Sequence, residues 1–403
     1  MKILFLGYVV SSEKANQLSG ASVAGNTMQL ELLRELNSMP DVDLDVCSIL
    51  PVATFPTEPR KLIRSMYHEI SPGIRAYSPG LITLPVLKQV AQIVGLLRAA
   101  AKLARHQEYD HVLTFNMLPL VGVAAWWVKK RRGVPIACLL ADPPVETRDT
   151  RSRITSAPLA AYNWWTRRLL SAVDQVIALT PEAARTYAPQ ARAMVVDGAV
   201  PARLFADLPG RSAVQQEKTI LFTGALTSYN GIAEIVAAMH LVTNPSAVLH
   251  IYGGGPMADF VRESARNSNR IVYHGKIDSS LIPKLQREAF LLVNPRQIDH
   301  PVSNVTFPSK MLEYMASGTP VLTTRLRSIS SDYEDLVYFA DVGSPEDLAV
   351  RIDALCATPS EEFAQVGAVA RDFVLETRTW HAAAERMVSF LSASEDRKSG
   401  EFD

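Results

Sequence analysis

The sequence predicts an α/β fold with two doubly wound, Rossmann-like domains, and three observations support this prediction. Short apolar runs alternate with longer segments of helical period along the 403 residues. The runs are apolar throughout rather than alternately polar, which is typical of parallel strands covered by helices on both faces. A polar stretch with Pro and Gly, residues 200–218, has no clear period and suits a linker between halves of similar size.

The individual elements follow from the same pattern. A helix is predicted over residues 23–38 and an amphipathic helix over residues 379–393, while the polar tail 396–403 is expected to be disordered. Strands are predicted at residues 1–10, 43–50, 111–116, 135–141, 175–180 and 193–199 in the first half, and at 218–226, 247–255, 270–276, 290–296 and 319–324 in the second.

The composition is that of an ordinary globular protein, with 48% hydrophobic residues, 20% charged residues and a formal net charge of zero. The charge is unevenly spread, because residues 60–170 hold 17 Lys and Arg against 6 Asp and Glu. This excess can indicate an anionic partner, such as a membrane surface, a nucleic acid or a phosphorylated substrate. An uneven solvated surface explains it equally well.

The sequence indicates no secretion signal, membrane span or metal site. The run MKILFLGYVV lacks a cleavage site and is typical of a first strand. The apolar stretch 118–128 is shorter than the roughly 18 residues that a membrane-spanning helix needs. Cys47, Cys138 and Cys356 lack metal-ligand spacing, so we expect them to be buried and reduced. The prediction is a cytoplasmic protein, soluble or peripheral to a membrane.

Loops that follow the strands are where a site is expected, because ligands bind beyond the carboxyl ends of the strands in an open parallel sheet. Three such loops of the second half are rich in glycine or turn residues: GALTSYNG from Gly224, YGGGP at 252–256 and HGKIDSS from His274. Backbone N–H groups at helix starts favour phosphate. Neither a complete GxGxxG fingerprint nor a GxxxxGK[ST] motif is present, which argues against a nicotinamide dehydrogenase or a P-loop NTPase.

The stretch FPSKMLEYMASGTPVL, residues 307–322, begins a predicted helix with Pro308 in its first turn. Ser309 and Lys310 then lie at the positive end of that helix, where phosphate binds. Glu313 shares a face with Lys310, and its carboxylate can accept two hydrogen bonds, as from a ribose diol. An ordinary ion pair between Lys310 and Glu313 explains the same spacing.

This stretch resembles the signature of the retaining glycosyltransferases of family 4, also called group 1, in the form FPSK…EYMASGTPV. Further segments match in order: ILFTGAL…NGIAEIVAAM, LHIYGGGP, IVYHGKID, LLVNPR and, in the first half, VIALT and VVDGAVPARLF. The resemblance implies a GT-B fold, with two Rossmann-like domains facing a central cleft. Residues 206–377 would bind a nucleotide sugar and residues 1–205 an acceptor, with the helix 378–395 packing back on the first domain.

The resemblance also implies roles for single residues of the second domain. Glu313 matches the glutamate that holds the ribose hydroxyls of the donor, and Ser309 and Lys310 would lie near the diphosphate. Arg296 is placed to supply a second cation, and Gly224 belongs to the loop that approaches the donor.

Two more segments are expected to approach the donor nucleotide. The backbone around His274, Gly275 and Lys276 would meet the base. In the first domain, family members carry a glycine-rich loop near the donor phosphate, and a plain strand–helix connection is the alternative. The best matches to that loop are Gly20, Ala21 and Ser22.

The chain departs from the family pattern at two positions. Val305 stands where many members have a second glutamate, which usually contacts the donor sugar. Asn230 stands where many have a lysine in the loop after the first strand of this domain, and the accompanying arginine is missing too. We expect Lys310 and Arg296 to replace these diphosphate cations.

Asp142 is the candidate catalytic residue of the first domain. It ends the predicted strand 135–141, at a place where family members often carry a polar residue of the catalytic site. Its carboxylate can accept a hydrogen bond from an acceptor hydroxyl or act as a base. A turn-forming Asp before Pro-Pro is an equally good explanation. Asn116 is a weaker candidate.

Basic and aromatic residues gather in the first half of the chain. WWVKKRR and NWWTRR pair Trp with basic residues, a composition favoured at membrane interfaces. Core helices with solvated basic edges are the commoner explanation. No nucleic-acid recognition module is found. A predicted helix between residues 85 and 106 places four basic residues on one face: Lys88, Arg98, Lys102 and Arg105.

The sequence therefore predicts a retaining, hexosyltransferase-type enzyme that moves a sugar from a nucleoside-diphosphate sugar, with a UDP-sugar as the best guess, to a saccharide or lipid-diphosphate-linked acceptor. The expected setting is polysaccharide biosynthesis, with peripheral contact to an anionic membrane and without a cofactor or metal. One alternative is a nucleotide-sugar epimerase. Another is a catalytically degenerate nucleotide-sugar-binding partner in a glycan assembly complex.

Overall fold

The computed structural model describes residues 1–18, 22–144, 153–208 and 218–393. The chain forms two compact units, and the first is discontinuous in sequence. Unit 1 comprises Met1–Val196 and Ala383–Asp403, and unit 2 comprises Asp197–Ala382. The first unit ends at Val196, whereas the sequence predicted that the first domain ends at residue 205. Residues 197–205 belong to unit 2, where the backbone of Val200 pairs with that of Thr379.

Unit 1 is built on an eight-stranded sheet with the order β10-β9-β8-β7-β1-β2-β5-β4. Neighbouring strands are parallel except β4 and β5, so one edge of the sheet is antiparallel. Its strands are β1 (Lys2–Gly7), β2 (Asp43–Ser48), β4 (Met66–Ser71), β5 (Ile74–Ser78), β7 (His111–Phe115), β8 (Ile136–Leu140), β9 (Gln175–Ala178) and β10 (Arg192–Val195), and a separate pair is formed by β3 (Leu62–Ile63) and β6 (Leu81–Ile82).

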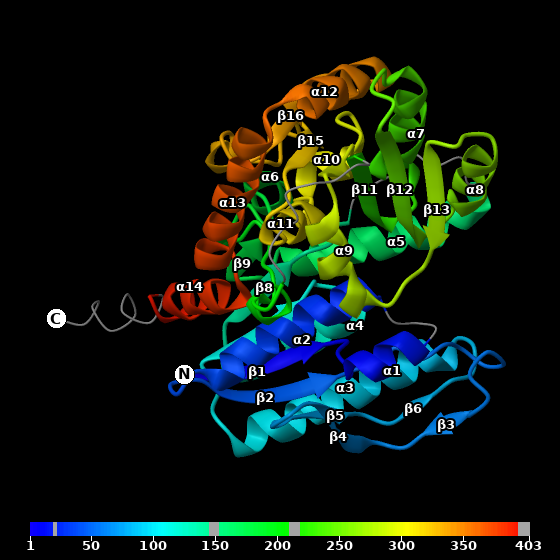
Figure 1. The fold of residues 1–403 in the computed structure, drawn as a ribbon. Coiled ribbons are helices and arrows are strands. Elements are labelled where there is room, and N and C mark those ends of the chain that lie inside the picture. The colour runs from blue at the N-terminus through cyan, green and yellow to red at the C-terminus, as the bar shows by residue number, and fades with distance from the viewer. Residues whose placement is uncertain (19–21, 145–152, 209–217, 394–403) are drawn as a thin grey trace. The chain divides into compact units, whose positions relative to one another are not determined.

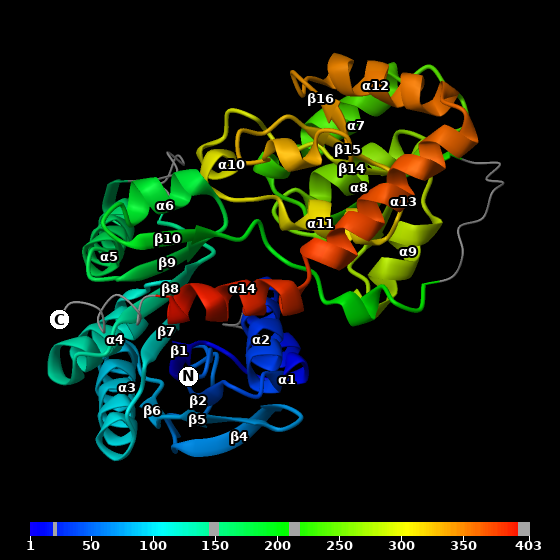
Figure 2. The same cartoon turned by 90° about the vertical axis from the view of Figure 1, so that its left-hand side faces the viewer.

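Helices cover both faces of this sheet (Figures 1 and 2). The helix expected over residues 23–38 is confirmed as α2, and α3, α4 and α5 pack side by side in that order. The helix expected near the C-terminus is present, and its final turns belong to unit 1. The helices are α1 (Ser12–Gln17), α2 (Val23–Ser38), α3 (Leu87–His106), α4 (Pro119–Arg132), α5 (Arg153–Leu170), α6 (Pro181–Tyr187) and α14 (Trp380–Ser392).

Unit 2 is built on a six-stranded parallel sheet with the order β13-β12-β11-β14-β15-β16. Helix α7 packs against α12, and α11 packs against α13. The strands are β11 (Lys218–Ala225), β12 (Ala247–Gly254), β13 (Ile271–Gly275), β14 (Leu291–Asn294), β15 (Val321–Thr324) and β16 (Tyr338–Ala340). The helices are α7 (Ile232–Leu241), α8 (Ala258–Arg266), α9 (Ile282–Glu288), α10 (Pro301–Val305), α11 (Ser309–Ala316), α12 (Pro345–Ala357) and α13 (Ser360–Thr377).

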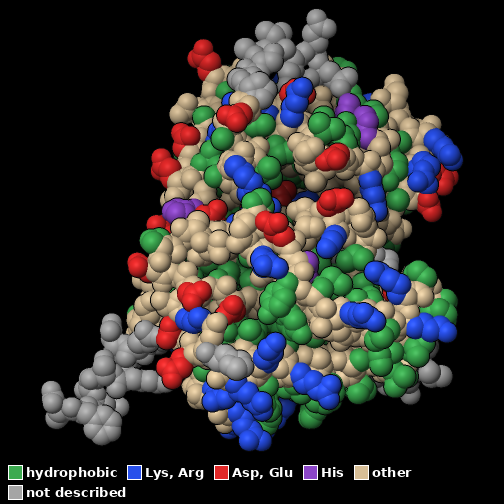
Figure 3. All heavy atoms as spheres, turned by 90° about the horizontal axis from the view of Figure 1, so that it is seen from below, with side chains coloured by type: hydrophobic (Ala, Val, Ile, Leu, Met, Phe, Trp, Pro, Cys, Tyr) green, Lys and Arg blue, Asp and Glu red, His purple; other side chains and the backbone are tan. Residues whose placement is uncertain are grey.

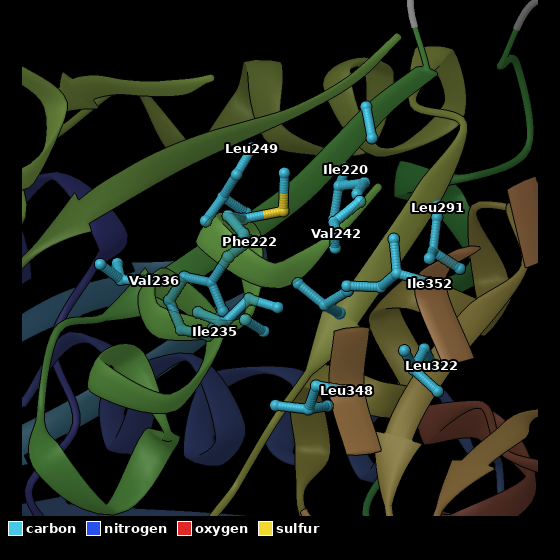
Figure 4. Packing of buried hydrophobic residues seen from close by; sticks show 14 of the residues in the cluster. Ile220, Phe222, Ile235, Val236, Val242, Leu249, Leu291, Leu322, Leu348 and Ile352 are labelled. Atoms are coloured by element: carbon cyan, nitrogen blue, oxygen red, sulfur yellow. The ribbon is translucent and has the colours of Figure 1, made fainter. Parts of the chain in front are cut away.

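The core of unit 2 lies between its sheet and the pair α7 and α12. Ile220 and Phe222 of β11 point to the same side because alternate residues of a strand share a face. There they meet Ile235 of α7 and Leu348 and Ile352 of α12 (Figure 4). All five side chains are buried, so the strand runs that looked continuously apolar are covered as expected.

The predicted strands are all present. Strand β16 was not predicted, and neither was the segment between residues 62 and 82. It holds β3 to β6, which are short and partly exposed, so their sequence lacks a long apolar run. Cys47, Cys138 and Cys356 are buried and free, as expected. No helix within the described ranges is long and apolar enough to cross a membrane. The expected linker falls partly, and the expected disordered tail wholly, outside the described residues.

Candidate functional site

The candidate site of unit 2 lies where the order of the strands reverses. The chain proceeds from β11 through β12 to β13 on one side, and then through β14 to β16 on the other. Strands β11 and β12 stay paired up to Ala225 and Gly254, but β11 pairs with β14 only at Ile220 and Leu221. The carboxyl ends of β11 and β14 therefore diverge, and such a switch point is where doubly wound sheets bind ligands.

The side chain of Tyr314, on α11, forms hydrogen bonds with the backbone of β11 at this point. Phe290 donates to the carbonyl of Thr219, so alternate residues of β11 turn their backbone groups toward β14. Thr223 is the next residue of that set beyond Leu221, and it has no partner on β14. The Tyr314 hydroxyl instead accepts from the Thr223 N–H at 2.9 Å and donates to the Thr223 carbonyl at 3.0 Å. Complete burial raises the pKa of Tyr314 to about 12.

This attachment places the start of α11 at the end of β11. Lys310 lies across Gly224, because a Cβ atom on that glycine would come within 3.0 Å of Lys310 Cδ and 3.1 Å of Nζ. Gly224 has φ +156°, a conformation that favours glycine. Ser309 is exposed at the first position of the helix, and Gly198 packs near it, since a Cβ atom on Gly198 would lie 4.0 Å from Ser309 Cβ.

Lys310 and Glu313 do not form an ion pair with each other, so the ordinary explanation of their spacing does not apply. Both side chains are partly exposed. Within the described part of the chain, no hydrogen bond or ion pair links either side chain to another group. The helix thus presents an ammonium and a carboxylate one turn apart, each with its hydrogen-bonding capacity unused.

Arg296, directly after β14, is a buried cation. It is only 7% exposed, and its guanidinium donates to the Thr306 hydroxyl at 2.9 Å and lies 5.2 Å from the Tyr229 ring. Its Nε has no partner, and no carboxylate pairs with it among the residues that the structure describes. Burial lowers the pKa of Arg296. A buried charge without a counter-ion is costly, so this geometry favours a bound anion.

Two aromatic residues hold Arg296 in place, and sequence reasoning did not find them. Tyr229, in the loop after β11, accepts a hydrogen bond at its carbonyl from the backbone N–H of Gln297 at 2.9 Å. His300 stacks on the Tyr229 ring with centroids 5.3 Å apart. Burial and the nearby Arg296 charge lower the pKa of His300, which favours its neutral form. The loop after β11 and the loop after β14 are therefore held together by a backbone hydrogen bond and by ring contacts.

The carboxyl ends of β12 and β13 carry a second group of predicted residues. Lys276 lies across Gly254, where an added Cβ would approach its Cε at 2.6 Å and its Cγ at 3.2 Å. Gly275 has φ +72° with open space around it. His274 stacks on Tyr252, with ring centroids 4.1 Å apart and planes 4° from parallel. Burial and the neighbouring His250 lower the pKa of His274.

In unit 1, Asn116 and Asp142 form a hydrogen-bonded pair at the ends of β7 and β8. The Asn116 amide oxygen accepts from the N–H groups of Ala141 and Asp142, both at 2.9 Å, and its amide nitrogen donates to the Asp142 carboxylate at 3.3 Å. Asn116 has φ +53°, a left-handed conformation that Asn adopts more readily than most residues. Desolvation by the surrounding protein raises the pKa of Asp142, although its side chain is exposed, and the hydrogen bond from Asn116 partly opposes this rise.

The predicted glycine-rich loop is described only at Ser22. Gly20 and Ala21 lie outside the described residues. The Ser22 hydroxyl accepts from the Gly25 N–H at 3.2 Å, so it caps α2. The buried Asn26 fixes the start of that helix, because it exchanges two hydrogen bonds with the backbone of Val10 at 2.9 and 3.0 Å. Sequence reasoning did not single out Asn26.

Of the two residues that depart from the family pattern, Val305 is buried and Asn230 is partly exposed. Asn230 donates to the carbonyl of Ala225 at 2.8 Å and so stabilises its own loop. Val305 ends α10 and is buried. Within the described residues, no group of three or more His, Cys, Asp or Glu could hold a metal ion.

Comparisons with known proteins agree with these observations. Residues 217–358 match the family described as glycosyl transferases group 1, and residues 27–199 match the glycosyl transferase 4-like domain. An uncharacterized glycosyltransferase of Methanocaldococcus jannaschii is 32% identical over 112 residues, which is 27% of this chain and 27% of that protein.

Solved structures share the fold over almost the whole chain. Sucrose-phosphate synthase from Thermosynechococcus elongatus aligns with a TM-score of 0.69 and 18% identity, covering 98% of this chain and 100% of that one. HepE of Anabaena in complex with UDP aligns with a TM-score of 0.66 and 16% identity, with the same coverage. HepE in complex with UDP-glucose aligns with a TM-score of 0.66 and 15% identity, again with 98% and 100% coverage.

The two sheets and the similarity to these solved structures show the GT-B fold. The two family matches, at residues 27–199 and 217–358, indicate a glycosyltransferase of group 1, family 4.

Proposed function

We propose that the protein transfers a hexose, with retention of anomeric configuration, from a UDP-sugar to a saccharide or lipid-diphosphate-linked acceptor in polysaccharide biosynthesis. The observation that carries the proposal is Arg296, a buried cation without a counter-ion at the carboxyl end of β14, among the described residues. A diphosphate supplies the anion that this guanidinium lacks, because Arg binds phosphate oxygens through paired N–H groups.

Lys310 is the second cation of the proposed donor site. Its side chain lies across Gly224, at the other strand of the switch point, and it stands in the first turn of α11, whose positive end also favours phosphate. Together Lys310 and Arg296 would take the places of the two cations that many family members carry after β11. They would stabilise the negative charge that develops on the leaving diphosphate, without a metal ion or cofactor.

Glu313 would hold the nucleoside. Its carboxylate is partly exposed and one helical turn from Lys310, so it can accept hydrogen bonds from both hydroxyls of a ribose. The stacked Tyr252 and His274, with the backbone of Gly275 and Lys276, would offer the base a surface. UDP is the proposed nucleotide because HepE was solved with UDP and UDP-glucose.

The acceptor would bind to unit 1, where Asp142 is the proposed catalytic residue. Asn116 holds both the backbone N–H and the carboxylate of Asp142, so it is a positioning residue. A carboxyl group with a raised pKa is closer to the pKa that proton transfer near neutral pH requires. Asp142 would accept the hydrogen bond of the attacking acceptor hydroxyl. The reaction would take place in the cytoplasm, beside the membrane.

Val305 and Asn230 favour a second function, a catalytically degenerate subunit that binds nucleotide sugars within a glycan assembly complex. Val305 is buried and cannot contact a sugar by a hydrogen bond from its side chain, and Asn230 is engaged in its own loop. This subunit would bind the donor but form no product.

The test is a thermal-shift series with UDP, GDP, ADP and their common sugars on wild type, Glu313→Ala and the control Glu376→Ala. Glu376 is exposed on α13. A ligand at 100 times its Kd adds about 2.7 kcal/mol to the stability of a protein that it binds only when folded. We expect one nucleotide to stabilise wild type and the control, and Glu313→Ala to lose the response while staying folded.

Product analysis separates the two functions. Incubation with the selected UDP-sugar and a membrane lipid extract should give a glycosylated lipid or saccharide, whose anomeric configuration is read by NMR. Binding without product favours the degenerate subunit, and an inverted anomer contradicts retention. If no nucleotide shifts the melting temperature, the proposed donor site is wrong.

A further inference from the structure

Strand β13 is an open edge of the sheet in unit 2. It is the last strand of that sheet, and β12 is its neighbour (Figure 1). The Leu249 N–H of β12 donates to the carbonyl of Arg270, so alternate residues from Arg270 onward turn their backbone groups toward β12. Ile271 and Tyr273 therefore turn their N–H and C=O groups away from the sheet. Among the described residues, no group forms a hydrogen bond with them.

The sequence of β13 lacks the residues that commonly protect an exposed edge. Lys and Pro on an edge strand prevent it from pairing with the edge of another sheet. The five residues of β13 read IVYHG, with neither Lys nor Pro. The sheet of unit 1 differs, because Arg386 of α14 donates to the carbonyl of Val195 on the edge strand β10. Strand β13 is therefore available to pair with a further strand.

A groove lies beside this open edge. It has a volume of about 460 Å³ and is lined by Ile271, Val272 and Tyr273 of β13 and by Arg262 and Arg266 of α8. Helix α8 packs on β13, and the Arg262 guanidinium lies 5.8 Å from the centre of the Tyr273 ring. A strand that pairs with β13 would thus meet the charged side chains of α8 as well as the free backbone groups.

Helix α8 carries charges of alternating sign on one exposed face. The second, third and fourth of them follow the first by three, four and seven residues, a spacing that places all four on one stripe. All four side chains are exposed. Asp259 forms an ion pair with Arg262, whereas Glu263 and Arg266 have no ion pair among the described residues. We call these residues, Asp259, Arg262, Glu263 and Arg266, the charged stripe.

The order of its charges makes the charged stripe complementary to itself. When two copies of α8 lie antiparallel, Asp259 of each copy meets Arg266 of the other. In the same register Arg262 of each copy meets Glu263 of the other, so all the charges are paired. A surface of one sign would repel a second copy. In Figure 3, for comparison, blue side chains gather at the lower edge of the face shown, with few red ones beside them.

We propose that β13 and α8 form a two-fold interface with a second copy of this chain. A two-fold axis perpendicular to the sheet sets the two β13 strands antiparallel, so that the outward groups of Ile271 and Tyr273 can pair across it. The same axis keeps both α8 helices on one face of the joined sheet and sets them antiparallel, as the charge pairing requires. An acidic or a basic peptide would match only half of the charged stripe. The inference does not depend on the proposed transfer reaction.

The test is sedimentation velocity of the full-length protein without nucleotide. Concentrations run from about 1 to about 100 μM, because an interface this small is expected to be weak. We expect wild type to change from monomer toward dimer over this range. Arg266→Asp places a carboxylate opposite Asp259 of the other copy, and Asp259→Arg places two guanidinium groups together. Each variant should weaken the dimer by about tenfold or more, since the repulsion occurs twice across the axis.

Mixing the two variants tests the antiparallel arrangement directly. In a mixed dimer the two carboxylates of the Arg266→Asp chain face the two guanidinium groups of the Asp259→Arg chain. An equimolar mixture should therefore form the dimer that neither variant forms alone. The control is Lys284→Asp, which makes the same change of charge at a position 64% exposed on α9 and should dimerise as wild type does. All variants should keep the circular dichroism spectrum and Tm of wild type.

Amide hydrogen exchange locates the strand contact. The N–H groups of Ile271 and Tyr273 should exchange about tenfold more slowly in wild type that is nine-tenths dimeric than in the Arg266→Asp variant. The N–H of Val272, which faces β12, should be protected in both. Wild type that remains monomeric at every concentration would overturn the proposal. A dimer that persists in both variants, or a mixture that remains monomeric, would contradict the assignment of this face.

Discussion

The Tyr314 hydroxyl replaces β14 as the hydrogen-bond partner of Thr223. It accepts from the Thr223 N–H and donates to the Thr223 carbonyl, in a place where both residues are fully buried. One side chain thus allows β11 and β14 to separate without leaving their backbones unsatisfied. The same side chain fixes helix α11, and with it Lys310 and Glu313, relative to the end of β11.

Replacing Tyr314 by Phe should destabilise unit 2. The change leaves the buried N–H and C=O of Thr223 without partners, and each unsatisfied group costs about 1–3 kcal/mol. Calorimetry should show a lower Tm, by roughly 2–4 °C for each kcal/mol in a unit of this size. Tyr67→Phe, at a position 57% exposed, is the control and should leave the Tm unchanged. An unchanged Tm in Tyr314→Phe would mean that the two backbone groups find other partners.

Replacing Gly224 by Ala should weaken nucleotide binding through Lys310. The new methyl group would collide with the lysine side chain, which must leave its position across the strand. Loss of a charge-assisted hydrogen bond to phosphate costs about 1.5–3 kcal/mol, so titration calorimetry should show affinity lower by about tenfold or more.

Gly73→Ala is the matched control for this substitution. Gly73 also has a positive φ, +77°, but nothing lies within 4 Å of an added Cβ. Ala at this position also carries a backbone cost, but it touches no candidate ligand contact. If Gly224→Ala binds the nucleotide as well as Gly73→Ala does, Lys310 has no role in holding the phosphates.

Replacing Arg296 by Met should abolish nucleotide binding without lowering the stability of the free protein. In the free protein the change removes a buried charge that has no counter-ion among the described residues, so the free energy of unfolding should stay unchanged or rise by about 1–3 kcal/mol. The thermal shift produced by the nucleotide should disappear. The exposed Arg266→Met serves as the control. A large loss of stability without ligand would show that Arg296 supports the fold rather than an anion.

The carboxylate of Asp353 should stabilise unit 2 in a pH-dependent way. Partial burial alone would raise the pKa of Asp353, but hydrogen bonds from Thr243 and Asn244 outweigh it and hold the pKa below its ordinary value. The carboxylate accepts from both backbone N–H groups and from the Thr243 hydroxyl at 2.8–3.1 Å. Such hydrogen bonds tie α12 to the loop after α7.

Asp353→Ala should therefore cost about 1–2 kcal/mol near neutral pH. Because the pKa of Asp353 is lower in the folded state, its carboxylate stabilises the fold at pH values above the pKa of the unfolded state, about 3.9. This stabilisation is lost as the pH falls through the lower pKa of the folded state. The Tm difference between wild type and Asp353→Ala should shrink below about pH 4. Asp372→Ala, on the exposed side of α13, should show no difference at any pH. A difference that grows toward acid would have the wrong sign.

The sequence predicted six of the eight strands in the sheet of unit 1 and five of the six in the sheet of unit 2, because long apolar runs and helical periods reflect burial directly. It could not predict β3 to β6, since strands of two to six residues with exposed side chains carry no such signal. It also placed Lys310 and Glu313 in the first turns of a helix and Arg296 after a strand, where the structure has them. Those placements needed only the helical period and the end of an apolar run.

The tertiary relationships of the site were beyond prediction from the sequence. Tyr314 has the pattern of an ordinary core residue of a helix, and nothing in its neighbours shows that its hydroxyl serves Thr223. The burial of Arg296 beside Tyr229 and His300 depends on the loop after β11 and the loop after β14, which lie far apart in the chain. Such contacts follow from packing and not from local spacing.

The discontinuity of unit 1 has a consequence for dissecting the protein. Arg192 on β10 lies over the Phe390 ring at 4.3 Å, and Arg386 donates to the carbonyl of Val195 at 3.0 Å, so the end of α14 covers the edge strand of the sheet. In terms of gene design, unit 2 is an insertion between Val196 and Ala383. A clone stopped at residue 205 would expose that edge, whereas one that rejoins the two flanking segments through a short linker would encode the whole of unit 1.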